Sequence, residues 1–207
     1  MPQPPLPSFD EPPSGYLTRA EAERQLVPLA NDFSEVWHGA WTDWLSLPDE
    51  IRSQLAPTTR ANVVHDLAVG RAKGVFGQRD GFRVCEELGF FKLYVGNSIV
   101  VRLKRLGDDD HLARNIQTDQ QKQWYLHRPI PGVPDGCTRL TVGYSLDRAQ
   151  VGLRDVVVSL QDGPNQLVYS FSINAEPQTT LIPIAPIPPD TKPTVQPKIA
   201  PREAGQI

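Results

Sequence analysis

The distribution of proline limits how much of this chain can fold. Proline has no backbone N–H to donate, and a segment rich in proline but poor in large apolar residues cannot offset the entropy cost of ordering. Six of the 21 prolines lie in the first 13 residues, and eight more lie between Pro177 and Pro201. We therefore predict a disordered leader at residues 1–15, a single α+β domain at residues 16–174 and a disordered tail at residues 175–207.

The overall charge and the cysteines exclude several classes of protein. A net charge of −3 offers no general attraction to nucleic acid or anionic membranes, so any such contact would need a local basic patch. The N-terminal Met-Pro-Gln-Pro-Pro lacks the basic start and apolar centre of a signal peptide, and the apolar runs are short. We expect a cytoplasmic protein with no membrane contact, in which Cys85 and Cys137 are free thiols.

Helical patterns dominate the first part of the domain, where residues 16–57 are expected to form a helical front. Thr18 and Glu21 have the spacing of a capping box, in which each side chain bonds to the backbone of the other residue, and they predict a short helix that ends near Leu26. A later amphipathic helix is predicted at residues 59–73, before two glycines.

Three tryptophans mark a further helix, predicted at residues 34–45. Trp37, Trp41 and Trp44 recur at i, i+4 and i+7, so they line one face of that helix. Aromatic side chains bury more apolar area than any others, so this face is expected to dock the helix on the domain. The alternative is that the three rings form a surface that binds a partner protein.

The most informative strand signal is a predicted hairpin at residues 90–106. Its two runs of β-branched and aromatic residues are joined by Gly96-Asn97, a dipeptide typical of tight turns. If these two residues form the whole loop, Val95 pairs with Ser98.

That register places Phe91, Arg102 and Lys104 on one face of the hairpin, with Arg105 nearby. Cations that hold a backbone beside an aromatic ring that stacks on a base are typical of single-strand nucleic-acid binding. The alternative is an exposed sheet face that charge keeps soluble. A degenerate nuclease domain is a related hypothesis, although no acidic residue precedes Lys104 on its strand.

The remaining pattern completes the fold class. After a helix at residues 118–127, alternating apolar residues predict a three-strand meander, with strands at residues 138–146, 153–160 and 166–173. Consecutive antiparallel strands with helices gathered at the front are typical of α+β folds. We therefore predict N-terminal helices packed on a mainly antiparallel sheet.

Local catalytic motifs are missing from the sequence. It contains no phosphate-binding glycine loop and no nucleophile elbow, and four predicted elements each hold one histidine: His38, His65, His111 and His127. We expect no cofactor and no metal site. An enzyme would need a site assembled from distant residues, seen as a deep polar pocket with His65 or His111 at its wall.

Three segments together resemble a group of uncharacterised bacterial proteins: Ile99–Leu106, Asn115–Gln121 and Leu140–Leu146. The resemblance covers about residues 59–173. Such proteins resemble components of two-gene modules, whose neighbouring gene encodes a helix-turn-helix protein with an ImmA-type metallopeptidase domain. The resemblance implies a non-enzymatic, toxin-like or regulated component of a toxin–antitoxin or phage-defence module. Its protein partner would contact the basic hairpin face or the three tryptophans.

Overall fold

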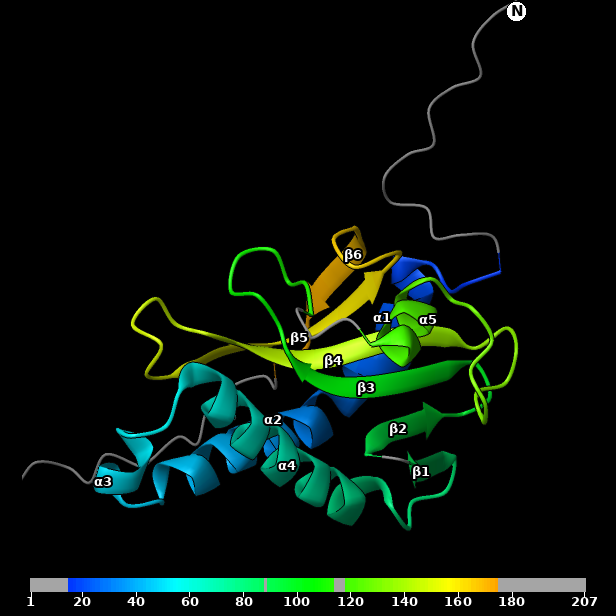
Figure 1. The fold of residues 1–207 in the computed structure, drawn as a ribbon. Helices are drawn as coiled ribbons and strands as arrows, with labels where there is room; N and C mark the ends of the chain where they lie inside the picture. The colour runs from blue at the N-terminus through cyan, green and yellow to red at the C-terminus, as the bar shows by residue number, and fades with distance from the viewer. Residues whose placement is uncertain (1–14, 88, 114–117, 175–207) are drawn as a thin grey trace, which may run out of the picture. The chain divides into compact units, whose positions relative to one another are not determined.

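The computed structural model describes residues 15–87, 89–113 and 118–174, so the predicted tail and all but the last residue of the predicted leader lie outside them. The described residues form a six-stranded sheet in which every strand lies beside its neighbour in the sequence (Figure 1). Its strands are β1 Phe82–Glu87, β2 Phe90–Val95, β3 Ile99–Arg105, β4 Thr138–Leu146, β5 Leu153–Gln161 and β6 Leu167–Ser172.

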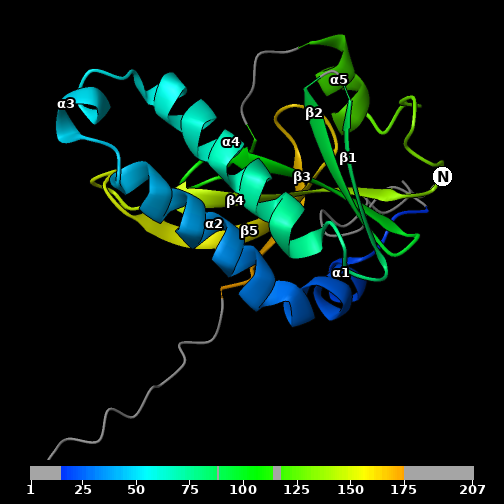
Figure 2. The same cartoon turned by 90° about the horizontal axis from the view of Figure 1, so that it is seen from below.

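Helices cover both faces of this sheet. The helices are α1 Arg19–Leu26, α2 Ala30–Leu45, α3 Asp49–Arg52, α4 Pro57–Phe76 and α5 Asp119–Tyr125, and a 3-10 turn lies at Val27–Leu29. Figure 2 shows α2 and α4 side by side across one face, while α5 packs on the opposite face. The predicted α+β class, with N-terminal helices on a mainly antiparallel sheet, is confirmed.

Several helix ends differ from the predicted ones. α2 begins four residues earlier than predicted, because the 3-10 turn leads directly into it. α4 begins two residues early at Pro57 and passes Gly74 to end at Phe76. A glycine inside a helix costs roughly 1 kcal/mol relative to alanine, and burial of the Phe76 ring offsets that cost. The capping box of Thr18 and Glu21 is present as predicted.

The centre of the sheet holds its one parallel pair among the described strands. β3 and β4 run parallel, whereas every other neighbouring pair is antiparallel. Parallel neighbours need a crossover connection, and here the chain from β3 to β4 passes over the sheet through α5. The predicted meander of β4, β5 and β6 is confirmed, while this parallel pair was not predicted.

The hairpin of β2 and β3 is offset by one residue from the predicted register. Val95 pairs with Ile99, so the loop has three residues, 96–98, instead of two. Because side chains alternate between the faces of a strand, a shift of one residue exchanges the faces of one strand relative to the other. Phe91 therefore belongs to the core under α2 and α4, and Arg102 points to the opposite face.

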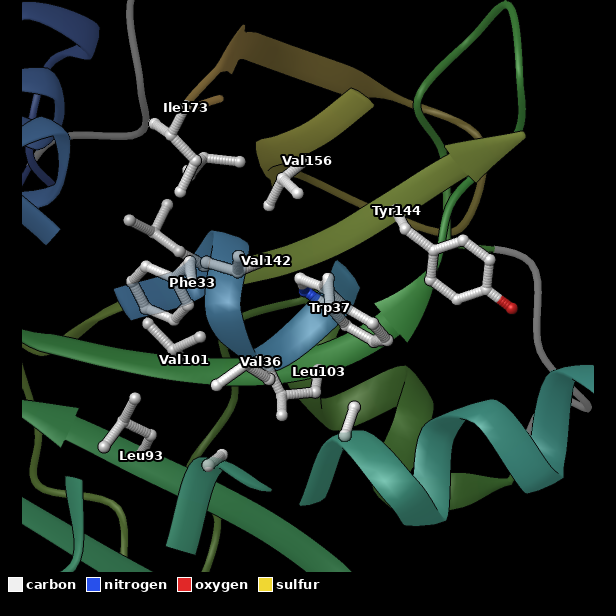
Figure 3. Packing of buried hydrophobic residues seen from close by; sticks show 14 of the residues in the cluster. Phe33, Val36, Trp37, Leu93, Val101, Leu103, Val142, Tyr144, Val156 and Ile173 are labelled. Carbon is white, nitrogen blue, oxygen red and sulfur yellow. The ribbon is translucent and has the colours of Figure 1, made fainter. Parts of the chain in front are cut away.

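The main core lies between the sheet and helices α2 and α4. Trp37 of α2 packs on Tyr144 of β4, with ring centroids 4.9 Å apart (Figure 3). Trp37, Trp41 and Trp44 are all buried, at 0%, 6% and 4% exposure. Their predicted docking role is confirmed. The alternative of a partner-binding aromatic surface stays a prediction, and it has little ring area to offer, because none of the three side chains is more than 6% exposed.

Candidate functional site

A polar cleft of about 920 Å³ opens at the carboxyl end of β3. One wall is α4, which contributes Asn62 and His65, and the other is the start of α5, which contributes Gln121. The end of β3 and the loop at residues 107–110 form the rest, with Lys104 among the lining residues. The cleft is within the size range of small-molecule sites, about 300–1,000 Å³.

The sheet topology explains why a cleft forms there. Parallel strands end at the same edge of a sheet, and the chain leaves β3 for α5 but leaves β4 for β5. Open sheets in which the chain leaves two neighbouring parallel strands in different directions have their ligand sites outside the carboxyl ends of those strands. In addition, β2 pairs with β3 only as far as Val101, so the end of β3 keeps β4 as its neighbour on one side and lies beside α4 instead of β2 on the other.

Lys104 is the central charged group of the cleft. It is only partly exposed, and it has no hydrogen bond or ion pair with any residue that the structure describes. Burial, together with repulsion from Arg102, lowers the pKa of its ammonium to about 8, and the carboxylate of Asp66 opposes this change. A lysine in this setting is partly neutral near pH 8.

Arg102 lies two residues before Lys104 on the same face of β3 and is buried, with 5% exposure. Its Nη1 donates to Oε1 of Gln121 at 2.9 Å, and its guanidinium lies 3.7 Å from the ring centroid of Phe90 and 5.2 Å from that of Trp124. Burial lowers the pKa of Arg102 to about 10. Its positive charge is thus held by an amide and two aromatic faces, without a carboxylate partner among the described residues.

His65 brings a third basic group to the cleft from α4. Burial lowers the pKa of its imidazole, and the positive charges of Lys104 and Arg102 lower it further. Its Nδ1 lies 3.2 Å from Oδ1 of Asp66, a contact that opposes the shift. His65 is therefore neutral at pH 7 and can both donate and accept a hydrogen bond.

Arg105 and Asp108 close the far end of the cleft. Arg105 Nη2 and Asp108 Oδ2 are 3.4 Å apart, and Oδ1 of Asp108 accepts a bond of 2.8 Å from the backbone N–H of Leu146. Asp108 therefore fastens the loop after β3 to the end of β4. The cation of Arg105 is compensated, whereas that of Lys104 is not.

The structure separates the predicted binding residues. Lys104 and Arg105 line the cleft, and Arg102 lies buried beside them. Phe91 is buried on the other face of the sheet, so the predicted exposed platform of cations around Phe91 is wrong. The platform fails because the loop has one residue more than expected and because α5 covers Arg102.

The sequence did not predict that His65 and Gln121 would lie in the same cleft. His65 was predicted as a possible pocket wall, and the pocket is present with His65 in its lining. His111 lies outside that lining, and its Nδ1 is 2.9 Å from Oγ of Ser170. Gln121 is polar although it lies on the buried side of α5 with Trp124 and Tyr125. A polar residue at such a position could have indicated, from the sequence, a buried polar group that binds it.

The histidines, cysteines, acidic residues and helices of the described residues bear on metal, thiol and membrane roles. Within residues 15–87, 89–113 and 118–174, no three histidine, cysteine or acidic side chains gather as a metal site. Cys85 and Cys137 are free thiols, as predicted. None of the described helices combines the length and the apolar character that a membrane crossing requires.

The chain matches no protein-family model, no curated protein and no solved structure. The resemblance to components of bacterial two-gene modules therefore stays a prediction that rests on the three segments named above.

Proposed function

We propose that this protein is a binding protein whose ligand carries a phosphate-type or carboxylate-type anion, held in the cleft at the end of β3. The observation that carries the proposal is the unpaired ammonium of Lys104, which lines the cleft beside the buried cation of Arg102. Burying a charge without a partner costs free energy, so two neighbouring cations in this position call for a nearby negative charge that offsets the cost. A bound anion would supply the missing negative charge.

Other donors in the cleft support the same ligand class. Arg105 uses one guanidinium nitrogen in its ion pair with Asp108, which leaves further N–H groups for a ligand. His65, neutral at pH 7, and Asn62 add hydrogen-bonding groups from α4. A small anionic molecule with polar substituents fits these donors better than an extended nucleic-acid strand, which would need a long exposed basic surface.

Binding of sulfate and pyrophosphate by isothermal titration calorimetry tests the proposal. The Lys104→Gln variant is expected to lose about tenfold or more in affinity, because hydrogen bonds to charged groups contribute roughly 1.5–3 kcal/mol. Lys122→Gln, which removes a lysine paired with Asp119 outside the cleft, is the matched control and is expected to bind normally. Equal affinity of both variants and the unchanged protein would rule the site out.

The pH dependence of sulfate binding gives a second test, since sulfate keeps its charge from pH 6 to pH 10. The anion binds the charged form of Lys104, whose pKa is about 8, so affinity is expected to fall above pH 8 by up to about tenfold per pH unit. The charged and titratable groups around Lys104 in the cleft are His65 and Asp66 from α4, Arg102 and Arg105 from β3, and Asp108, Asp109 and Asp110 from the loop. His65 is already neutral at pH 7, because burial and the neighbouring cations lower its pKa, and the pKa of Arg102 is about 10, so neither of these two groups accounts for a loss of affinity at pH 8.

Membership of a toxin–antitoxin or phage-defence module is a second proposal. It is supported by one spatial observation: β3 and β4, which hold most or all of two resembling segments, and residues 118–121 of the third are neighbours around Arg102 and Gln121, whereas residues 115–117 lie outside the described residues. A cleft built from these segments would suit a component whose partner binding is regulated by a ligand. Co-expression with the product of the adjacent gene, followed by size-exclusion chromatography, tests it. Separate elution and no effect on growth would count against it.

A further inference from the structure

Lys104 differs from the other lysines that the structure describes. Lys73 is paired with Glu86, Lys92 with Glu87 and Lys122 with Asp119. A carboxylate partner stabilises the ammonium form, in which the nitrogen lone pair is bound to a proton and cannot attack a carbonyl. Of the four described lysines, Lys104 is the one without a carboxylate partner, and it is also the one that lines the cleft.

The charges around Lys104 favour a neutral amine. Arg102 projects from the same face of β3, and His65 and Lys104 repel each other when both are charged. The only carboxylate that acts on Lys104 among the described residues is that of Asp66, which is exposed to solvent. Desolvation and a neighbouring cation are the two arrangements by which proteins turn a lysine into a nucleophile.

We propose that Lys104 is a covalent site that forms an imine with an aldehyde or 2-oxo acid carrying an anionic group. This inference rests on the proposed anion-binding function and specifies the ligand of the same cleft. The anionic group of the ligand would occupy the donors of Arg105, and the carbonyl carbon would face the amine of Lys104. His65 lies in the same lining and can relay a proton.

The reaction balances without an oxidant or a reductant. The lone pair of the Lys104 nitrogen attacks the carbonyl carbon, a C–N bond forms, and the carbonyl π electrons move to oxygen. A proton passes from nitrogen to oxygen, which gives a carbinolamine, and a further proton allows water to leave. The product is a protonated imine, and addition of water reverses each step. The positive charge of the imine replaces that of the original ammonium beside the ligand anion.

Reductive trapping with glyoxylate tests the proposal. The full-length protein is incubated with glyoxylate and cyanoborohydride at pH 7, and carboxymethyl-lysine is located by peptide mass spectrometry. Lys104 is expected to be labelled roughly tenfold or more faster than Lys122, since the lowered pKa of Lys104 leaves more of it as the neutral amine than in an ordinary lysine. Excess sulfate is expected to slow labelling of Lys104 alone. Equal labelling of Lys104 and Lys122, with no effect of sulfate, would overturn the proposal.

Lys104→Arg tests the labelled position, and sulfate binding by the unchanged protein separates this inference from the proposed function. Arginine keeps the positive charge but cannot form an imine. We expect the variant to lose the labelled site while Lys122 is labelled as before, with an unchanged circular dichroism spectrum. Sulfate binding without trapping in the unchanged protein would reject the imine and leave the anion site standing. Trapping at Lys104 without sulfate binding would reject the anion site and, with it, the ligand class proposed here.

Discussion

The two faces of the sheet differ in character although the same strands build both. On the face under α2 and α4, strands β2 to β6 contribute almost only apolar side chains, which pack against Trp37 and its neighbours (Figure 3). On the face under α5, the same strands bury charged and polar groups: Lys92, Arg102, Arg139, Thr141, Ser145, Ser159 and Gln161. Four atoms of these side chains have no hydrogen-bond partner among the described residues: Arg139 Nε, Ser145 Oγ, Ser159 Oγ and Gln161 Nε2.

The two faces of the sheet therefore differ in how they affect the stability of the fold. An apolar face gains free energy from each buried methylene, whereas a buried cation or an unpaired hydroxyl reduces stability. Buried groups with perturbed pKa values are more common at functional sites than elsewhere. The face under α2 and α4 therefore holds the fold together, and the face under α5, which leads to the cleft, is where a ligand would compensate the buried charges.

The largest expected effect tests whether stability is concentrated under α2 and α4. Trp37→Ala is expected to cost about 3–5 kcal/mol, because it leaves a cavity in a closely packed core. Trp124→Ala removes a ring of the same size from the smaller cluster under α5 and is expected to cost less. Urea unfolding followed by circular dichroism measures both. Equal losses would remove the distinction between the two faces.

A conservative control accompanies this pair. Trp37→Phe keeps an aromatic ring and removes the indole Nε1, which is buried without a hydrogen-bond partner among the described residues. It is expected to lose clearly less stability than Trp37→Ala. A loss as large as that of the alanine variant would mean that the full indole, and not an aromatic ring alone, is needed to fill this part of the core.

The second prediction concerns the buried cation on the α5 face. The double variant Arg102→Met/Gln121→Met replaces both hydrogen-bonding partners by apolar side chains of similar length. Stability is expected to stay the same or to rise by about 1–4 kcal/mol, as often happens when buried charged groups give way to apolar ones. The midpoint of urea unfolding provides the measurement, and a fall of more than about 1 kcal/mol would show that Arg102 is structural. Leu103→Gln, on the opposite face of β3, is the matched control and is expected to destabilise.

The smallest expected effect lies on the outer side of the helices. Arg71 of α4 binds Asp43 of α2 with two hydrogen bonds, of 2.7 Å and 2.8 Å, which lower the pKa of Asp43. Both side chains are more than a third exposed, so solvent screens the pair. Asp43→Asn is expected to cost only about 0–1 kcal/mol in thermal or urea unfolding. A loss comparable to that of Trp37→Ala would show that the link between α2 and α4 depends on this ion pair.

Local features of the fold were predicted where neighbouring residues decide them. The capping box at Thr18, the alternation within each strand of the hairpin and the three meander strands all depend on groups a few residues apart. The register between β2 and β3 was missed because it depends on whether Ser98 joins the loop, which the Gly96-Asn97 signal does not decide.

The candidate site was predicted only as separate residues. Lys104 and Arg105 were selected as basic groups on a strand, and His65 was named as a possible pocket wall. Nothing in the sequence indicated that α4 would meet the end of β3, or that α5 would bury Arg102 against Phe90. Contacts between residues far apart in the chain depend on how the elements pack, and that is not encoded in any short pattern.

The sequence by itself determined the fold class, since periodicity and capping are properties of short segments whose apolar faces must be buried. The tertiary structure decided the rest: the parallel pairing of β3 and β4, the choice of which face is apolar, and the cleft at their shared edge. The physical reason is that these features, like the pKa of Lys104, depend on burial and on groups from different elements, such as Asp66 of α4, which no spacing along the chain brings together.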